Sequence, residues 1–390
     1  MNYKISHPTK VVNCEIDLPS SKSISNRLLI IKALCKENFM IENLSDSDDT
    51  KSLELALNSK TNLIDVGAAG TTFRFLTSYL STKVGEEFTI TGTDRMKKRP
   101  IKELVNSLKE LDAQIEYIEE ENSPPLKIKG AKLKGKKIKI DGSVSSQFIS
   151  SILLVSPTIK GGLELGIKGD LVSKPYVLMT LNLMKVFGIK WDWTCNKITI
   201  EEQNYKAENY TVESDWSAAT FWFQSASLSE KCKIILRGLN EESIQGDSAC
   251  KEIFKDLGVD SVFKNGNLIL TKNKRVSPSE TYNLIQTPDI YQSLKCTLFA
   301  LKKGSEFTGI QTLKNKETDR ITAVENELQK INTPKIIETY NDHRMAMSFA
   351  PLSLKFGELH VKLPTLGLII ILQVLFFNSS STNLVVIHFL

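Results

Sequence analysis

Hydrophobic residues recur every three or four positions in many separate segments of the chain, which is the spacing of one buried helix face. Ile24, Leu28 and Ile31 form one such face. The same spacing predicts helices around residues 53–57, 73–80, 101–111, 148–155, 177–186, 218–222, 290–301, 321–331 and 345–352. Apolar runs over residues 39–44 and 88–91 predict strands, and a further strand ends within residues 210–215. The alternation of strands and helices predicts an α/β fold.

Polar clusters stand immediately before most of these helices. Residues 19–27 read Pro-Ser-Ser-Lys-Ser-Ile-Ser-Asn-Arg, so serines can cap a helix whose first turns carry Lys22 and Arg27. Exposed backbone N–H groups, the positive end of the helix dipole and two cations together suit a phosphate group. A capped surface helix explains any single cluster of this kind equally well.

The repetition of this pattern favours a ligand site over a set of unrelated caps. Further clusters occur at residues 67–74, 94–100, 141–147, 169–176, 286–289, 314–320 and 339–344. The chain contains neither a GxGxxG fingerprint nor a P-loop sequence. We therefore expect βα units that direct several helix N-termini to a common place, where positive potential collects without a metal ion.

Two other patterns have simpler explanations. Asp46, Asp48 and Asp49 could hold a metal ion, but they precede a helix, where carboxylates interact favourably with the helix dipole. Lysines alternate with apolar residues over residues 131–140, which predicts the solvent face of a hairpin. No aromatic residues are interleaved with these lysines, so the pattern does not indicate nucleic-acid binding.

Composition narrows the class of protein. The chain has 390 residues, enough for two domains, and its 41% hydrophobic and 24% charged residues are typical of globular proteins. A net charge of +5 is too small to indicate a nucleic-acid partner, yet it fits acidic small molecules. The six cysteines form no CxxC pair, which argues against a zinc site or a disulfide framework. The N-terminal sequence has no signal or transit pattern, so we expect a cytoplasmic protein.

Taken together, the motifs resemble those of the 5-enolpyruvylshikimate-3-phosphate (EPSP) synthase family, the 3-phosphoshikimate 1-carboxyvinyltransferases. The matching segments, in that family's order and spacing, are residues 19–27, 67–74, 95–100, 145–147, 173–176, 316–320 and 340–347. The resemblance implies two domains, each an inside-out α/β barrel of three βαβαββ units. By that likeness, the first domain spans residues 20–213 and the second combines residues 1–19 with residues 214–390. It also implies an active site in the cleft between the domains.

The resemblance implies a reaction as well. Members of the family transfer the enolpyruvyl (1-carboxyvinyl) group of phosphoenolpyruvate to the 5-hydroxyl of shikimate 3-phosphate and release phosphate, on the shikimate pathway to chorismate and the aromatic amino acids. The expected partners are these two small molecules, with no nucleic acid and no membrane. No metal or organic cofactor is expected, and we expect a monomer.

The family's motifs assign residues to each substrate. By resemblance, the residues that hold shikimate 3-phosphate are Lys22, Ser23, Arg27, Ser145, Ser146, Gln147, Ser173, Tyr176, Asp289 and Lys316. The residues that surround phosphoenolpyruvate are Lys22, Gly70, Arg95, Gln147, Arg320 and Arg344. The many cations among them fit this assignment, because both substrates are multiply anionic and must be held in register before they react.

Catalysis requires one proton to leave the 5-hydroxyl and another to reach the methylene carbon. We assign Asp289 as the base at the hydroxyl and Glu317 as the group at the methylene carbon. Lys22 assists the departure of phosphate, and His343 orients the cluster. Neighbouring cations depress the pKa of a carboxyl group, so Glu317 needs local desolvation to act as an acid.

The chain departs from the family pattern in two places. Ala68 stands where many relatives carry asparagine. After about Leu363, a segment with a further lysine for phosphoenolpyruvate and a closing helix is absent, and an apolar run over residues 366–377 replaces it. We attribute this tail to a frameshifted or wrongly assigned end of the coding sequence. The run is too short for a membrane span of about 20 residues, and an aggregation-prone segment or an improvised strand is the alternative.

Two other functions compete with this assignment. UDP-N-acetylglucosamine enolpyruvyl transferase shares the fold, but its family places a reactive cysteine in the loop that corresponds to residues 94–100, where this chain has none. A relative that binds shikimate 3-phosphate without turning it over is supported only by the altered tail.

Overall fold

The computed structural model describes residues 2–331, 336–362 and 386–389. The chain divides into two compact units, which are described separately below. The continuous unit consists of residues 20–212, and the discontinuous unit combines residues 1–19 with residues 213–390. Both units mix helices with sheets, so the predicted α/β fold is confirmed.

The continuous unit contains two four-stranded sheets and one two-stranded sheet. Its strands are β3 (Ile41–Glu42), β4 (Leu63–Asp65), β5 (Glu87–Thr91), β6 (Gln114–Tyr117), β7 (Leu126–Lys129), β8 (Lys137–Asp141), β9 (Leu163–Lys168), β10 (Asp192–Thr194), β11 (Lys197–Ile200) and β12 (Tyr210–Thr211). Its helices are α1 (Lys22–Leu34), α2 (Asp48–Leu57), α3 (Gly70–Ser81), α4 (Asp94–Lys97), α5 (Lys102–Glu110), α6 (Ser146–Val155), the 3-10 turn η1 (Ser156–Thr158) and α7 (Lys174–Val186).

The discontinuous unit has the same kinds of sheet. Its strands are β1 (Asn2–Ser6), β2 (Val11–Asp17), β13 (Lys231–Arg237), β14 (Val259–Lys264), β15 (Asn267–Lys272), β16 (Thr281–Asn283), β17 (Glu306–Thr308), β18 (Ile337–Glu338), β19 (Leu359–Lys362) and β20 (Val386–Phe389). Its α-helices are α8 (Trp216–Leu228), α9 (Cys250–Lys255), α10 (Tyr291–Ala300), α11 (Arg320–Gln329), α12 (His343–Phe349) and α13 (Ser353–Phe356). Its 3-10 turns are η2 (Gly246–Ala249), η3 (Pro288–Ile290), η4 (Gln311–Asn315) and η5 (Ala350–Leu352).

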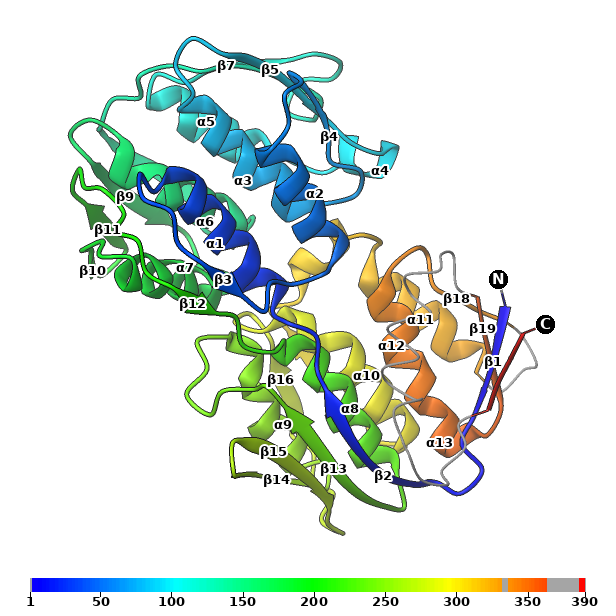
Figure 1. Cartoon of the computed structure of the whole chain (residues 1–390). Coiled ribbons are helices and arrows are strands. Elements are labelled where there is room, and N and C mark those ends of the chain that lie inside the picture. Colours follow the sequence, from blue (N-terminus) through cyan, green and yellow to red (C-terminus); the bar gives the residue numbers. More distant parts are fainter. Residues whose placement is uncertain (1, 332–335, 363–385, 390) are drawn as a thin grey trace. The chain divides into compact units, whose positions relative to one another are not determined.

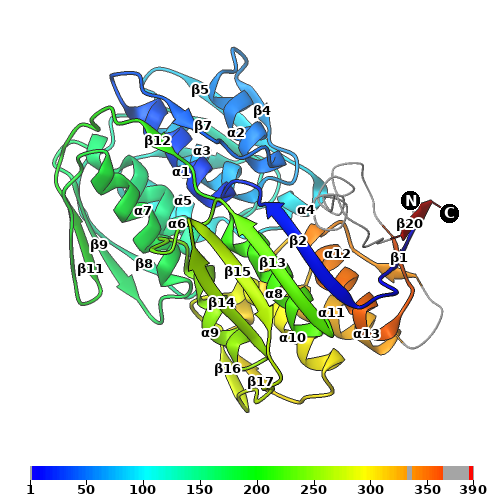
Figure 2. The same cartoon turned by 60° about the horizontal axis from the view of Figure 1, so that its bottom comes forward.

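Three of the sheets repeat one arrangement. Their strand orders are β4-β5-β7-β6, β8-β9-β11-β10 and β2-β13-β15-β14. In each sheet the first two strands are parallel and the last two form an antiparallel pair. With the intervening helices, this is the expected βαβαββ unit. In the third sheet, β2 supplies the first strand and lies alongside β13 (Figure 2).

The helices lie inside each unit and the sheets lie outside. All residues of α3 are buried, and α8 is buried except at Ser217. A helix that is buried on every side must pack against neighbours all round, and Figure 1 shows α3 and α6 within the continuous unit with the sheets at its periphery. Hydroxyl groups inside α3 find partners within the unit, because Thr77 donates to the Phe73 carbonyl oxygen at 2.8 Å and Ser78 pairs with Ser151 of α6 at 2.6 Å.

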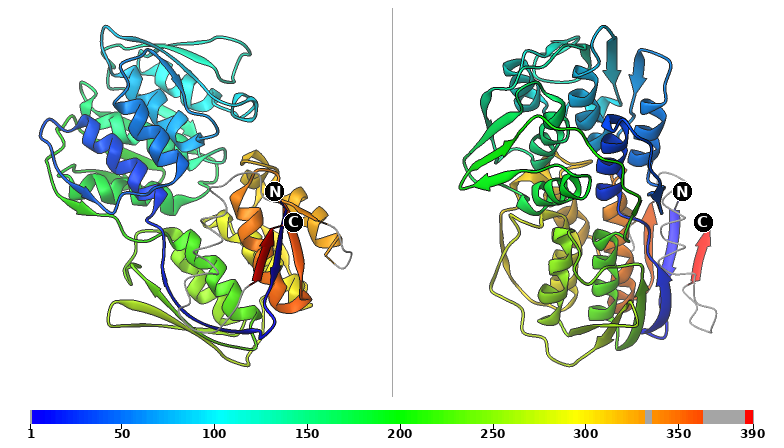
Figure 3. Two further views of the ribbon diagram at one scale, coloured as in Figure 1. Left: turned by 45° about the vertical axis from the view of Figure 1, so that its right-hand side comes forward. Right: turned by 60° about the vertical axis from the view of Figure 1, so that its left-hand side comes forward.

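Strand β1 lies between two strands from the far end of the chain. It pairs antiparallel with β19, where Ile5 faces Leu359, and antiparallel with β20, where Tyr3 faces Phe389. Figure 3 shows β1 and the last described strand side by side in both views. The apolar run expected over residues 366–377 lies outside the described residues.

Some local expectations differ from the structure. The predicted hairpin over residues 131–140 is wrong, because β8 pairs in parallel with β9 instead. The alternation itself is real, since Ile138 and Ile140 are buried and Lys137 and Lys139 are exposed. The strand predicted over residues 39–44 is shortened to β3.

The acidic cluster before α2 lies where it was expected. Asp48 and Asp49 lie in the first turn of α2, as the dipole argument predicts. All six cysteines are free thiols. Among the described residues, no helix is long and apolar enough to cross a membrane.

Candidate active site

In the continuous unit, residues predicted to bind the substrates lie at helix N-termini. Lys22 begins α1, Gly70 begins α3 and Ser146 begins α6. Ser21 caps α1 by accepting a hydrogen bond from the backbone N of Ile24, and Ser145 caps α6 by accepting one from the backbone N of Gln147. These caps form because a serine oxygen takes over one of the N–H groups that the first helical turn leaves unpaired.

A line of polar contacts connects these helix starts. Lys22 Nζ lies 3.7 Å from Asp49 Oδ2, and the backbone N of Thr71 donates to Asp49 Oδ1 at 3.2 Å. Gln147 Nε2 donates in turn to Thr71 Oγ1 at 3.1 Å. Lys22 and Gln147, which the sequence assigns to both substrates, therefore belong to one connected group. Asp49, which links them, was not among the predicted site residues.

Arg27 is held by the fold of its own unit. Its side chain is nearly inaccessible, with 1% of the residue exposed, and Nε donates to Thr180 Oγ1 at 2.7 Å. Its two terminal nitrogens donate to the backbone carbonyls of Ser23 and Tyr176 at 2.7 and 3.1 Å. Burial lowers the pKa of Arg27 to about 10, so the guanidinium stays charged at neutral pH. Arg27 thus joins Ser23 to Tyr176, two other predicted ligands of shikimate 3-phosphate.

Ser173 precedes α7 in an unusual backbone conformation. Its φ and ψ are 54° and 41°, in the left-handed region, and its side chain is buried without capping the helix. This backbone region is costly for residues other than glycine, and such strain is found preferentially at functional sites. The backbone N of Tyr176 donates to the Ser173 carbonyl at 3.0 Å, which closes the turn, and the Tyr176 carbonyl accepts from Arg27.

Cations also gather around Gly70. Arg74 Nη1 donates to the Gly70 carbonyl oxygen at 2.8 Å, and Arg99 approaches the same glycine. Both arginines are buried, whereas Arg95, the predicted ligand of phosphoenolpyruvate, is exposed on α4. Sequence alone singled out Arg95 over Arg99, because nothing in the local pattern shows which member of a basic loop turns inward.

The discontinuous unit holds a cluster of carboxylates around one arginine. Arg320, the first residue of α11, is 2% exposed. Its guanidinium donates to Asp342 Oδ2 at 2.8 Å, to Asp289 Oδ1 at 2.9 Å and to Glu317 Oε2 at 2.7 Å. Burial alone would lower the pKa of Arg320, but the three carboxylates outweigh it and raise this pKa above its usual range. The predicted base and the predicted methylene-directed group are thereby fixed to one cation.

Asp289 faces two further cations. Lys316 Nζ lies 3.3 Å from Asp289 Oδ1, and Arg344 Nη2 lies 3.6 Å from Asp289 Oδ2. Burial raises the pKa of Asp289, but the coulombic effects of Lys316, Arg344 and Arg320 are larger together and hold this pKa well below its usual range. Asp289 is therefore ionised in the substrate-free protein and, while paired with all these cations, is a weak base.

A second buried carboxylate lies near this cluster. Asp247 is 2% exposed, Ser217 Oγ donates to its Oδ2, and its Oδ1 has no hydrogen-bond partner among the described residues. Burial and the negative charge of Asp289 raise the pKa of Asp247 to about 6, while Arg344 opposes the shift. Two neighbouring carboxyl groups thus have pKa values displaced in opposite directions, which is an arrangement found at acid–base sites.

Helix α12 brings the last predicted residues to this cluster. Asp342 caps α12 by accepting from the backbone N of Arg344 at 2.9 Å, and Arg344 Nη1 donates to the Asp289 carbonyl oxygen at 3.3 Å. His343 is the first residue of α12 and is half-buried. Sequence reasoning missed Asp342 and Asp247. Asp342 could have been found, because it is a helix-capping residue directly before the predicted site residue His343.

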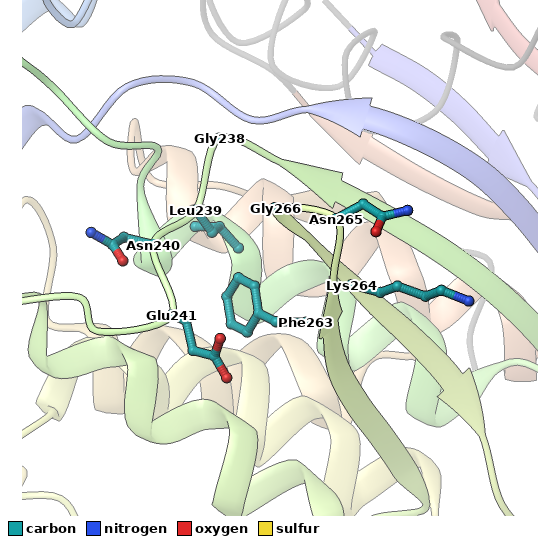
Figure 4. A pocket seen from close by; sticks show the side chains of 8 residues that line it. All are labelled: Gly238, Leu239, Asn240, Glu241, Phe263, Lys264, Asn265 and Gly266. Carbon is teal, nitrogen blue, oxygen red and sulfur yellow. The ribbon is translucent and has the colours of Figure 1, made fainter.

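One cavity of about 440 Å³ lies elsewhere in the discontinuous unit. It is lined by residues 238–241 and 263–266 (Figure 4). Phe263 lies between the two loops, and the side chains of Lys264 and Asn265 extend away from it. None of the predicted site residues lines this cavity, and its chemistry offers no group of converging cations.

Two expectations concern groups other than these side chains. Within the part of the chain that the structure describes, no set of three His, Cys, Asp or Glu residues is placed to hold a metal ion. The second is the family's C-terminal lysine. Its position would come after residue 363, in the segment before β20 that lies outside the described residues.

The geometry divides the chemistry between the two units. The continuous unit gathers helix N-termini and cations, which bind anions. The discontinuous unit holds carboxylates in an ion-pair network, which suits proton transfer once a substrate enters.

A family model described as EPSP synthase (3-phosphoshikimate 1-carboxyvinyltransferase) matches residues 6–59 and 52–365. A 3-phosphoshikimate 1-carboxyvinyltransferase of Bacteroides fragilis (strain YCH46) is 43% identical over 386 residues, covering 93% of this chain and 94% of the relative. One from Mannheimia haemolytica is 32% identical over 415 residues, covering 91% and 93%.

A solved structure shares the fold. The structure of EPSP synthase from Acinetobacter baumannii superposes with a TM-score of 0.73 at 21% identity, covering 92% of this chain and 93% of that one. The family match and the identity to the Bacteroides protein each extend over most of the sequence. The chain therefore belongs to the EPSP synthase family.

Proposed function

We propose that this protein transfers the enolpyruvyl group of phosphoenolpyruvate to the 5-hydroxyl of shikimate 3-phosphate and releases phosphate. The observation that carries the proposal is the pairing of Asp289 and Glu317 with one buried guanidinium, that of Arg320. Two carboxylates fixed in this way can act on two different protons of one reaction. Family membership supports the same transfer.

Anion binding is assigned to the continuous unit. The helix starts at Lys22 and Ser146, together with Arg27, Ser173 and Tyr176, hold shikimate 3-phosphate. Lys22, Gly70 and Gln147 contact phosphoenolpyruvate, and Arg95, Arg320 and Arg344 complete its surroundings. The connected contacts from Lys22 through Asp49 to Gln147 keep these groups in a fixed arrangement before substrate arrives.

Proton transfer is assigned to the discontinuous unit. In the addition step, Asp289 takes the proton of the 5-hydroxyl while the oxygen of that hydroxyl forms a bond to C2 of phosphoenolpyruvate. Glu317 delivers a proton to the methylene carbon, which becomes a methyl group. In the elimination step, that methyl group gives one proton back to Glu317, the bond between C2 and the phosphate oxygen breaks, and Lys22 assists the departing phosphate. His343 orients the carboxylates.

Substrate binding also makes Asp289 a stronger base. The carboxylate faces Lys316 and Arg344 in the free protein. When anionic substrates engage these cations, the cations lower the pKa of Asp289 less strongly. Asp289 therefore becomes a stronger base when the substrates are in place, which couples proton abstraction to binding.

The finer assignments follow the family likeness. We infer that the protein acts as a cytoplasmic monomer with two small-molecule substrates and requires no metal ion or organic cofactor. The UDP-N-acetylglucosamine reaction is not favoured, because residues 94–100 contain no cysteine to serve as the reactive thiol.

The test is a turnover assay with both candidate acceptors. The purified protein is incubated with phosphoenolpyruvate and either shikimate 3-phosphate or UDP-N-acetylglucosamine, and released phosphate and the enolpyruvyl product are quantified. We expect product only with shikimate 3-phosphate.

D289N and E317Q are expected to lower kcat on the order of 100- to 10,000-fold. E325Q, which alters an exposed carboxylate on α11, is the control and is expected to leave kcat unchanged. Product from the nucleotide sugar alone, or D289N as active as the wild type, would contradict the proposal.

A further inference from the structure

The turn that leads into α12 has an unusual backbone. Tyr340 and Asn341 both adopt the left-handed region, with φ of 54° and 56°. This region is unfavourable for residues that carry a Cβ atom, so two of them in a row persist only where the surroundings enforce the conformation. The next residues are Asp342, which caps α12, and His343 and Arg344, which begin it. The backbone of the left-handed pair therefore sets how the first turn of α12 is presented.

Hydrogen bonds hold the residues on both sides of this pair. Thr339 Oγ1 donates to the Lys362 carbonyl oxygen at 2.7 Å, which ties the turn to β19. The backbone N of Asp342 donates to the Thr339 carbonyl oxygen at 2.8 Å, which closes the turn. Asp342 also accepts from Arg320 Nε at 2.8 Å. The start of α11 thus holds the residue that follows the left-handed pair.

A second residue of α11, Glu327, holds the chain before and within the pair. It lies about two turns after Arg320, and its side chain is completely buried. Its Oε2 accepts from the backbone N of Glu338 at 3.1 Å, and its Oε1 accepts from the Tyr340 hydroxyl at 2.7 Å. Lys330 Nζ, 2.6 Å from Oε1, supplies the opposite charge that a buried carboxylate needs. Helices α11 and α12 lie side by side, so this contact joins neighbouring elements (Figure 1).

The hydroxyl of Tyr340 is suited to this bond. Burial, together with the hydrogen bond to Glu327, raises the pKa of Tyr340 to about 12, so the hydroxyl keeps its proton and donates at neutral pH. The residue is 40% exposed, so core packing does not fix its ring on every side. The polar contact with Glu327 therefore carries much of the restraint on this side chain.

We propose that Glu327 is a positioning residue, which holds Tyr340 and so keeps the left-handed turn before α12 in place. Through that turn it fixes His343 and Arg344. This role rests on the proposed function, in which His343 orients the carboxylates and Arg344 faces phosphoenolpyruvate. Arg344 also lies 3.6 Å from Asp289, so a shift at the start of α12 reaches the base as well.

Kinetics of Y340F test the role, because this change removes the donor and keeps the ring. We expect kcat/KM for phosphoenolpyruvate to fall on the order of 3- to 10-fold, the loss of one hydrogen bond, while the Kd for shikimate 3-phosphate stays within about twofold. Y282F is the matched control, because the Tyr282 hydroxyl also makes one hydrogen bond in this unit, from the backbone N of Ser279 at 3.2 Å. It should leave kcat/KM unchanged. Unaltered kinetics for Y340F would overturn the proposal.

E327Q tests the same contact from the other side. Its amide cannot accept from both donors and pair with Lys330 as the carboxylate does, so kcat/KM should fall at least as far as in Y340F. In the E327Q background, Y340F should add little, because the contact is already weakened. Fully additive effects would show that the two residues act independently, and would contradict the role of Glu327.

Substitutions of Asn341 test the backbone part separately. N341A and N341G remove the same side chain, but glycine adopts the left-handed region without steric cost and alanine does not. N341A should therefore have a kcat/KM lower than that of N341G by on the order of fivefold. N341G should also restore part of the activity lost in Y340F. Equal activity of N341A and N341G would show that the left-handed turn is not what the contact preserves.

Hydrogen exchange separates this inference from the proposed function. Amides in the first turn of α12 should exchange faster in Y340F and E327Q than in the wild type and Y282F. If the wild type forms no product but exchange accelerates there, the proposed reaction fails and the holding role of Glu327 stands. If the wild type is active and Y340F matches it in both exchange and turnover, the holding role fails and the reaction stands. Faster exchange with unaltered kinetics would also overturn the positioning role.

Discussion

Arg320 Nε lies 2.8 Å from Asp342 Oδ2, and both side chains are almost completely buried. Asp342 also caps α12, so one carboxylate fixes the arginine at the start of α11 and the first turn of the next helix. The pair positions Asp289 and Glu317, which bond to the same guanidinium, although Asp342 itself was not expected to belong to the site.

D342N should therefore lower both stability and turnover. Removing one partner of a buried ion pair costs on the order of 3 kcal/mol in the free energy of unfolding, because the remaining charge stays buried. Urea denaturation followed by circular dichroism measures this loss. E358Q breaks the exposed pair between Lys4 and Glu358 and should leave the denaturation midpoint nearly unchanged, since solvent screens such pairs. Equal midpoints for D342N and the wild type would contradict the positioning role.

D247N should change how stability depends on pH. Asp247 has a pKa of about 6 in the folded protein against an ordinary value of 3.8, so the folded state binds its proton more tightly than the unfolded state does. The contribution of Asp247 therefore favours folding at low pH, and it is lost as pH rises through about 6. D247N removes this dependence and should be more stable than the wild type at pH 8, by up to about 3 kcal/mol, with little difference near pH 4.

Thermal denaturation of D247N and the wild type across this pH range provides the measurement. D256N, the same substitution at an exposed position, serves as its control. Asp289 contributes in the opposite direction in both proteins, because its depressed pKa gives stability that is lost as pH falls below the unfolded value. A constant difference between D247N and the wild type at every pH would argue against a raised pKa at Asp247.

R27A should affect binding and folding together. Arg27 contacts Thr180 and two backbone carbonyls inside its own unit, so its removal leaves buried acceptors unpaired and should lower the melting temperature. Loss of the cation should also weaken shikimate 3-phosphate binding, on the order of 1.5–3 kcal/mol. Calorimetric titration on the folded variant measures the second effect. R237A, at an exposed arginine, should change neither quantity, and an unaltered dissociation constant for R27A would assign Arg27 a purely structural role.

Residues 20–212 should fold when expressed alone. All three sheets of this unit are complete within the segment, and helices α3 and α6 form its interior. A cooperative thermal transition with the expected helical circular dichroism would confirm this. The segment 213–390 lacks β1 and β2 and should fold poorly unless residues 1–19 are supplied. A molten continuous segment would contradict the division into units.

The features that the sequence predicted correctly depend on residues that are close together in the chain. The helix that starts at Lys22 and its serine cap follow from spacing and side-chain chemistry within a few positions. The inward turn of Arg99, the pairing of Arg320 with Asp342 and the partner of β8 depend on segments that are distant in the chain. No local pattern distinguishes a buried arginine from an exposed one in a basic loop, so the sequence alone could not show that Arg99 is buried and Arg95 is exposed.

The parallel pairing of β2 with β13 has a consequence for synthesis. Val11 is aligned with Lys231, and the whole continuous unit lies between them in the sequence. At about 5–20 residues per second, a ribosome needs roughly 10–40 s to produce the missing neighbour after β2 has been made. The first strands must wait unpaired during that interval, while the segment behind them already folds. We therefore expect chaperones to stay in contact with the nascent N-terminus until β13 emerges.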